Sequence, residues 1–276
     1  MKKGLLVFSK ALFVLLAAIA AGELLSMLFL PFKAIKEVQI MVKFLFDACM
    51  ALIPIGLYIR FFKKDGWELG FHHSHKLMQL GAGSLLGMAF MVSSVSLVLL
   101  LGGVEFRGLT SDFTLTGFML LLAASLSVSM GEETLFRGAI QGLFKQAYGP
   151  WIGILCSSTI FFILHSGNPG MFNSFLPPLN LFFGGLILGM LREKTSSLWL
   201  PIGFHWTWNL CQELSGFSVS GFAAKHALLS MQLVPGKELL NGGSFGLEGS
   251  IVNLLLIFLI CLFTAIHLRK KKTYSF

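Results

Sequence analysis

The sequence predicts an all-α membrane protein, a polytopic helix bundle with about eight transmembrane helices. Of its 276 residues, 55% are hydrophobic and only 12% are charged, whereas about 25% of the residues of an average soluble domain are charged. Apolar runs long enough to cross a bilayer as helices recur along the chain. They lie at about 5–30, 39–61, 78–102, 114–141, 150–165, 179–191, 198–213 and 250–268.

The first run also resembles a secretory signal peptide, because Lys2 and Lys3 precede an apolar segment. Its apolar pattern continues as far as Leu30, beyond the usual end of such a peptide, which favours an uncleaved first helix. Within one membrane domain we expect four parts. These are N-terminal transmembrane helices (1–110), core helices (111–213), a glycine-rich outer loop (214–249), and a last transmembrane helix with a basic tail (250–276).

Lysine and arginine are enriched in alternate loops and in the C-terminal tail. This bias places both termini in the cytoplasm by the positive-inside rule, in a cell membrane. It also accounts for the net charge of +8 through attraction to anionic lipid, so we expect no nucleic-acid partner. The residues are Arg60, Lys63, Lys64, Lys76, Lys145, Arg192, Lys194 and Arg269 to Lys272.

The glycine pairs and the cysteines indicate no chemical function. Glycines four residues apart, at Gly83 with Gly87 and at Gly185 with Gly189, allow transmembrane helices to approach closely. The four cysteines fall in different spans without paired spacing, which indicates neither a disulfide framework nor a cysteine metal site.

The stretch "GEETLFRG", residues 131–138, places three charges beside about twenty uncharged residues. Each charge near the bilayer centre costs about 2.5–3.5 kcal/mol, so these side chains need partners or a polar cavity. Glu133 and Arg137 have the i, i+4 spacing of a helical ion pair. Glu132 is rotated by about 100° from Glu133 and is left to face another group.

Polar residues on two later spans supply candidates for that group. His165 ends the run "FFILH", and "HWTWN" places His205 and Asn209 on one helical face. Two kinds of hydrolytic site fit these residue types. Either Zn²⁺ is bound by Glu and His and activates water, or Glu acts alone as general base while His and Asn orient the water and stabilise an oxyanion.

Structural readings also account for each residue taken singly. Glu133 with Arg137 can be a purely structural ion pair. A single intramembrane histidine is as often a hydrogen-bonded structural group as a catalytic one, and Asn209 can bridge two helices.

Three motifs in this order resemble the CPBP family of intramembrane proteases, which includes the type II CAAX prenyl endopeptidases and bacteriocin-immunity proteins. "EETLFRG", "FFILH" and "HWTWN" match its EExxxR, FxxxH and HxxxN motifs, within a resemblance from Leu121 to Gln212. The first 110 residues offer no comparable match.

The resemblance implies a membrane-embedded endopeptidase that acts on a peptide or membrane-protein substrate. It makes Glu132 with His165 the water-activating base and gives His205 and Asn209 the oxyanion-stabilising or ligand role. Glu133 and Arg137 match the second acid and the arginine, and Phe161 the aromatic position. If zinc is bound, Glu132, His165 and His205 are its ligands; zinc is not established by the sequence.

Two rival functions use the same polar residues. One is a non-proteolytic binding or bacteriocin self-immunity protein, which holds a peptide or a partner helix. The other is a transporter with an ion site at the membrane midplane, for which we expect internal repeats that the sequence does not display.

The span limits create a problem of depth. Taken literally, they put Glu132 near the inner end of the fourth helix and His165 near the outer end of the fifth. We therefore expect the fourth helix to continue to about Lys145, which brings Glu132 closer to mid-membrane.

Overall fold

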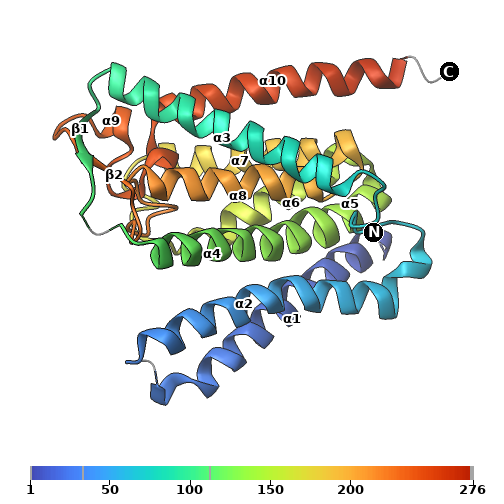
Figure 1. Cartoon of the computed structure of the whole chain (residues 1–276). Coiled ribbons are helices and arrows are strands. Elements are labelled where there is room, and N and C mark those ends of the chain that lie inside the picture. Colours follow the sequence, from blue (N-terminus) through green and yellow to red (C-terminus); the bar gives the residue numbers. More distant parts are fainter. Residues whose placement is uncertain (1, 33, 112, 274–276) are drawn as a thin grey trace.

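The computed structural model describes residues 2–32, 34–111 and 113–273 and is built almost entirely from helices (Figure 1). The all-α class is confirmed. The main helices are α1 (Lys2–Leu28), α2 (Lys36–Leu57), α3 (Lys76–Leu100), α4 (Leu115–Glu133), α5 (Gln141–Tyr148), α6 (Pro150–Leu164), α7 (Leu176–Thr195), α8 (Trp199–Leu214) and α10 (Ile251–Thr273). The end of the predicted basic tail, 274–276, lies outside the described residues.

Several helices are long and apolar enough to cross a membrane. Four qualify by length and composition among the described residues: Gly4–Leu28, Lys36–Asp65, Lys76–Leu100 and Leu115–Tyr148. Pro150–Leu164 and Ile251–Ile266 are shorter apolar helices. A polytopic helical membrane protein is therefore supported, while the count of eight spans and the cytoplasmic placement of both termini stay predictions.

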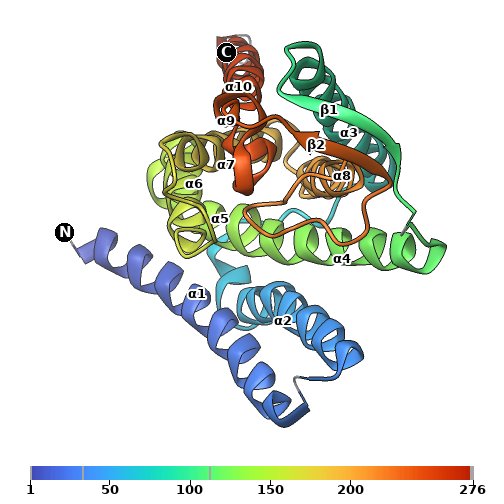
Figure 2. The same ribbon diagram turned by 90° about the vertical axis from the view of Figure 1, so that its left-hand side faces the viewer.

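Helix α8 lies inside the bundle, between α3, α4 and α7 (Figure 2). Glycines let α3 and α8 approach each other closely. A Cβ atom at Gly83 would collide with the carbonyl oxygen of Leu200, and one at Gly87 with that of Phe204. The first predicted glycine pair therefore has the packing role that its spacing indicates.

The second glycine pair brings α7 against α6 and α5. A Cβ atom at Gly185 would lie 2.9 Å from the Cβ atom of Ser158, and one at Gly189 would lie 3.0 Å from Oε1 of Gln141. Because α7 can approach this closely, its backbone carbonyls come within reach of polar side chains on the neighbouring helices.

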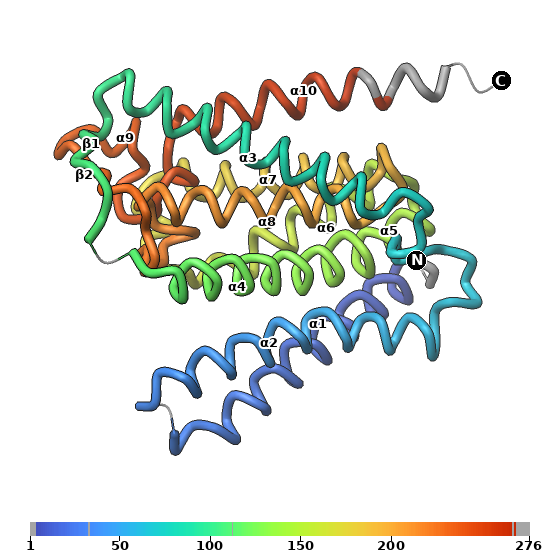
Figure 3. Tube along the Cα trace, viewed as in Figure 1, coloured from blue at the N-terminus to red at the C-terminus, as the bar shows by residue number. Residues whose placement is uncertain are grey.

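Helices α1 and α2 form a hairpin that packs on one side of the bundle, against α4 and α5 (Figure 3). We call this unit the α1–α2 hairpin. It contains the ion pair of Lys43 with Asp47, at 3.4 Å, and Lys10 of α1 pairs with Asp65, which follows α2, at 2.8 Å.

The predicted outer loop is more ordered than its glycine content indicates. It contains strand β2 (Leu229–Leu233), the short helix α9 (Glu238–Asn241) and the 3₁₀ turns η5 (Gly243–Phe245) and η6 (Leu247–Gly249). Strand β2 pairs antiparallel with β1 (Val104–Leu109), which follows α3. This two-stranded sheet, which the sequence analysis missed, ties the outer loop to the end of α3.

Candidate active site

The charged turn, residues 131–138, lies inside the longest apolar helix. This helix runs without a break from Leu115 to Tyr148, which confirms the predicted extension of the fourth span. Its α-helical geometry ends at Glu133, and a π-helical segment, η4 (Thr134–Ile140), follows before α5. Such π-helical turns are rare in proteins, and those that occur are frequently found at functional sites. Glu132 therefore lies in the middle of a helix, not at its end.

Glu133 and Arg137 form the predicted ion pair in a fully buried position. Nη1 of Arg137 lies 3.1 Å from Oε1 of Glu133, and neither side chain has exposed surface. Nη2 of Arg137 donates to the carbonyl oxygen of Gly185 at 3.4 Å, and the guanidinium carbon lies 4.5 Å from the centre of the Phe161 ring. The arginine thus joins the α4 helix to α6 and α7.

His165 caps the C-terminus of α6, and a residue one turn earlier fixes its ring. Nδ1 of His165 lies 2.8 Å from the carbonyl oxygen of Phe161. Because a carbonyl only accepts, Nδ1 carries the proton and Nε2 of the neutral ring has a free lone pair. The two rings also stack, with centroids 4.3 Å apart. Nε2 is thereby directed at Glu132, whose Oε1 is 3.9 Å away.

His205, in the middle of α8, contacts both acids of the charged turn. Its Nδ1 lies 2.8 Å from Oε1 of Glu133, and its Nε2 lies 3.8 Å from Oε2 of Glu132. The predicted Glu133–Arg137 pair was correct but incomplete, because Glu133 also orients His205. The sequence places these residues 72 positions apart, so no local spacing could have revealed the contact.

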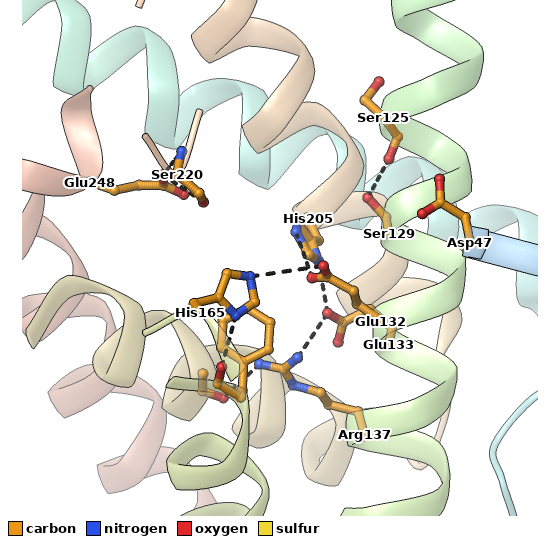
Figure 4. Close-up of polar contacts among 12 residues, drawn as sticks. Asp47, Ser125, Ser129, Glu132, Glu133, Arg137, His165, His205, Ser220 and Glu248 are labelled. Atoms are coloured by element: carbon orange, nitrogen blue, oxygen red, sulfur yellow. Dashed lines mark hydrogen bonds and ion pairs between the residues drawn. The ribbon is translucent and has the colours of Figure 1, made fainter. Parts of the chain in front are cut away.

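The Glu132 carboxylate therefore faces the Nε2 atoms of two histidines whose other nitrogens are occupied (Figure 4). Both gaps are too wide for a direct hydrogen bond, and a water molecule can bridge groups at such separations. The side chains of Glu132, His165 and His205 keep 21%, 15% and 10% of their surface exposed. This arrangement can bind and deprotonate a water molecule, which the fully buried Glu133 cannot reach.

Asn209 is less well placed than the other predicted residues. It lies one turn after His205 on α8 and is half-buried. Among the described residues, no side-chain hydrogen bond or ion pair joins it to Glu132 or to either histidine. Its role remains a prediction from spacing and resemblance.

Another acid that the sequence analysis did not single out lies near the histidines. Glu248, in η6, is 4% exposed, and its Oε2 accepts hydrogen bonds from Ser220. Burial raises the pKa of Glu248 above its usual value, while the Ser220 hydrogen bonds and the nearby His165 and His205 lower it. A lone acid in "FGLEGS" was the available signal, but nothing in the sequence relates it to the histidines.

The donor set has the chemistry of a zinc site but does not form a compact cluster. One carboxylate and two ring nitrogens are the ligands of many catalytic zinc ions, and Nδ1 hydrogen bonds of the kind seen here orient such histidines. Within the described ranges, however, no three His, Cys, Asp or Glu side chains are grouped as a metal site.

The segment that contains Glu132, His165 and His205 is similar to known proteins. Residues 114–211 match the Rce1-like family, described as type II CAAX prenyl endopeptidase Rce1-like. An "Uncharacterized 24.3 kDa protein" of Escherichia coli is 33% identical over 87 residues, which cover 31% of this chain and 38% of that protein. The matched region is thus well under half of this relative. Segment 114–211, which holds all three predicted motifs, is therefore similar to the Rce1-like family, and the CPBP resemblance is confirmed over this segment.

Proposed function

We propose that this protein is an intramembrane endopeptidase in which Glu132 and His165 activate a water molecule. One observation carries the proposal. The partly exposed Glu132 carboxylate faces the Nε2 atoms of His165 and His205, at 3.9 and 3.8 Å, while Nδ1 of each histidine has a hydrogen-bond partner that orients the ring. The family match supports a protease of the CAAX type.

The first step is attack by water on the substrate carbonyl. A water between Glu132 and His165 gives a proton to the carboxylate as its oxygen bonds to the carbonyl carbon. The carbonyl π electrons move to oxygen and form the oxyanion of a tetrahedral intermediate. The Phe161 carbonyl keeps the proton of His165 on Nδ1, so Nε2 accepts a hydrogen bond from the same water.

The second step is collapse of the intermediate. In this proposal both ring nitrogens of His205 carry protons. Nδ1 donates to the Glu133 carboxylate at 2.8 Å, and Nε2 and the Asn209 side chain donate hydrogen bonds to the oxyanion. The carbon–nitrogen bond breaks, and the leaving amine takes the proton that Glu132 removed from water. Glu132 therefore ends the cycle unprotonated.

Zinc is an optional part of the proposal. Glu132, His165 and His205 would hold the ion, which would supply a Lewis acid that lowers the pKa of water. The metal content of the purified protein, with activity before and after chelation, decides between the alternatives. A metal-free enzyme that resists chelators leaves the Glu–His scheme alone.

For the substrate we propose a peptide at the membrane surface, the C-terminal part of a lipidated protein. This choice rests on the family match and on the position of the site within apolar helices. No described residue by itself selects a prenyl group over another lipid.

The test is cleavage of a farnesylated peptide ending in a CAAX sequence by purified protein in liposomes, followed by mass spectrometry. We expect E132Q and H165A each to lower kcat/KM by about 10²–10⁴-fold, the usual contribution of a general base. E105Q, which changes an exposed acid of β1, should retain wild-type activity.

Undiminished cleavage by both E132Q and H165A would contradict the proposal. A protein that binds the peptide without cleaving it, in the wild-type form and in all variants, would favour the binding or immunity function instead. An unprenylated peptide of the same sequence shows whether the lipid is recognised.

A further inference from the structure

A segment of the outer loop lies against both histidine-bearing helices. We call this segment, Ser218–Phe222, the strap. Nε2 of Gln212, near the end of α8, donates to the carbonyl oxygen of Ser218 at 2.6 Å. The side-chain Nδ2 of Asn168 donates to the carbonyl oxygen of Ser220 at 2.9 Å, and the backbone N–H of Asn168 donates to the carbonyl oxygen of His165 at 3.0 Å.

Ser220 has a backbone conformation that needs support. Its φ of 49° lies in the left-handed region, which is unfavourable for a residue with a Cβ atom. Oε2 of Glu248 accepts both its amide N–H, at 2.5 Å, and its hydroxyl, at 2.9 Å. Glu248 therefore holds Ser220 in the conformation that presents its carbonyl oxygen to Asn168.

The glycine-rich turn before Glu248 packs closely against the backbone of the strap. The Gly221 amide donates to the carbonyl oxygen of Phe245 at 3.1 Å. Gly246 has a φ of 87°, and a Cβ atom there would collide with the carbonyl oxygen of Ser218. Only glycine permits this contact, which explains the glycine content of a loop that the sequence left without a role.

These hydrogen bonds connect Glu248 through Ser220 and Asn168 to His165, the histidine proposed to bind the water molecule. Figure 4 shows Glu248 and Ser220 on the side of His165 away from Arg137. Glu248 is buried and has no part in the hydrolytic steps, yet among the described residues its carboxylate accepts hydrogen bonds from Ser220 of the strap alone. A buried acid that takes no part in the reaction is costly unless its hydrogen bonds have a function.

We propose that Glu248 is a positioning residue, which fixes the strap and thereby holds the end of α6, and with it Nε2 of His165, toward Glu132. This inference rests on the proposed function for its kinetic consequence. Its structural consequence, a fixed and shielded His165, does not depend on catalysis.

The test compares E248L, E248Q and the control E238L. Leucine removes both acceptor oxygens, while glutamine keeps one oxygen that can accept from the Ser220 amide and hydroxyl. Glu238 is an acid of the same loop whose Oε1 accepts only from the Gly236 amide at 3.0 Å, at an exposed position. S220A, which removes one of the two hydrogen bonds, gives a milder variant should E248L fail to fold.

Two measurements are made on each variant. The first is kcat and KM for the farnesylated peptide. The second is the rate of carbethoxylation of His165 by diethyl pyrocarbonate, measured by mass spectrometry relative to the exposed His72. The second reports the position of His165 whether or not the peptide is cleaved, so failure of the proposed function and failure of this inference remain distinguishable.

In E248L we expect kcat to fall, and His165 carbethoxylation to rise, by about tenfold or more, as loss of hydrogen bonds to a charged group predicts. KM should be unchanged, and E248Q should restore both quantities most of the way. S220A should change both in the same direction by a smaller factor, and E238L should match the wild type. E248L values equal to those of E238L, or a raised KM at constant kcat, would overturn the inference.

Discussion

The α1–α2 hairpin and the bundle around α8 each contain an acid–base pair with i, i+4 spacing, yet the two pairs differ in surroundings. In the hairpin, Nζ of Lys43 lies 3.4 Å from Asp47, and the lysine side chain is 52% exposed. In the bundle, Glu133 and Arg137 are 3.1 Å apart and have no exposed surface. Glu133 of the second pair also contacts His205 of the site, at 2.8 Å.

The difference shows that i, i+4 spacing predicts the contact, while burial determines how much stability is lost when the contact is broken. A pair with one exposed partner should lose less when broken, because the exposed charge can be solvated. A buried pair that loses one partner leaves an uncompensated charge in an apolar interior. Substitutions in the two regions should therefore have very different effects.

The largest effect on stability is expected for R137M. It leaves Glu133 buried with only His205 as a partner, so the free energy of unfolding should fall by about 3–5 kcal/mol. Denaturant unfolding in detergent, followed by circular dichroism, measures the change. R107M, which removes an exposed arginine of β1, is the matched control, and equal losses in the two variants would remove the distinction between the regions.

Replacing both members of the buried pair should be milder than replacing one. Among the described residues, Oε2 of Glu133 and Nε of Arg137 have no hydrogen-bond partner, so the pair is imperfectly satisfied. In E133Q/R137M no charge is left uncompensated, and Gln can still accept from Nδ1 of His205. We expect the double variant to recover about half or more of the R137M loss. A double variant as unstable as R137M would show that packing of the arginine, not its charge, is what matters.

Much of this contrast could be predicted from sequence. The apolar runs indicated the helices, and the i, i+4 spacing predicted the Glu133–Arg137 pair, because these features depend on neighbouring residues only. The three motifs singled out Glu132, His165 and His205, which the structure brings together; their catalytic roles stay predictions. The extension of the fourth helix followed from the need to bring Glu132 and His165 to one depth.

The rest depends on contacts between distant segments. The bond from Glu133 to His205 joins α4 to α8, and the bonds from Glu248 to Ser220 join two turns of a loop. The π-helical segment also has no simple sequence signal. Strands β1 and β2 lie more than 100 residues apart, so no hairpin pattern was available to predict their pairing.

Glycine substitutions extend the comparison to helix packing. In the bundle, G87A places a Cβ atom against the carbonyl oxygen of Phe204 and the hydroxyl of Thr207, and overpacking of this kind costs about 1–3 kcal/mol. In the hairpin, G56A meets no atom within 4 Å and should be neutral or slightly stabilising through helix propensity. Thermal denaturation in detergent should separate the two variants, and a destabilised G56A would show that the hairpin packs as tightly as the bundle.

The smallest effect is expected for K43Q in the hairpin. This change removes the charge of a lysine whose side chain is 52% exposed, and glutamine can still donate a hydrogen bond to Asp47. Exposed pairs contribute about 0.2–1 kcal/mol, and side-chain hydrogen bonds between transmembrane helices average about 0.6 kcal/mol, so the free energy of unfolding should fall by less than about 1 kcal/mol. The same denaturant titration used for R137M measures it, with wild-type peptide cleavage as a second readout. A K43Q loss as large as that of R137M would mean that Asp47, which is itself 11% exposed, depends on its lysine as fully as Glu133 depends on Arg137. Burial of the acid, and not burial of both partners, would then determine how much the free energy of unfolding falls when the basic partner is replaced.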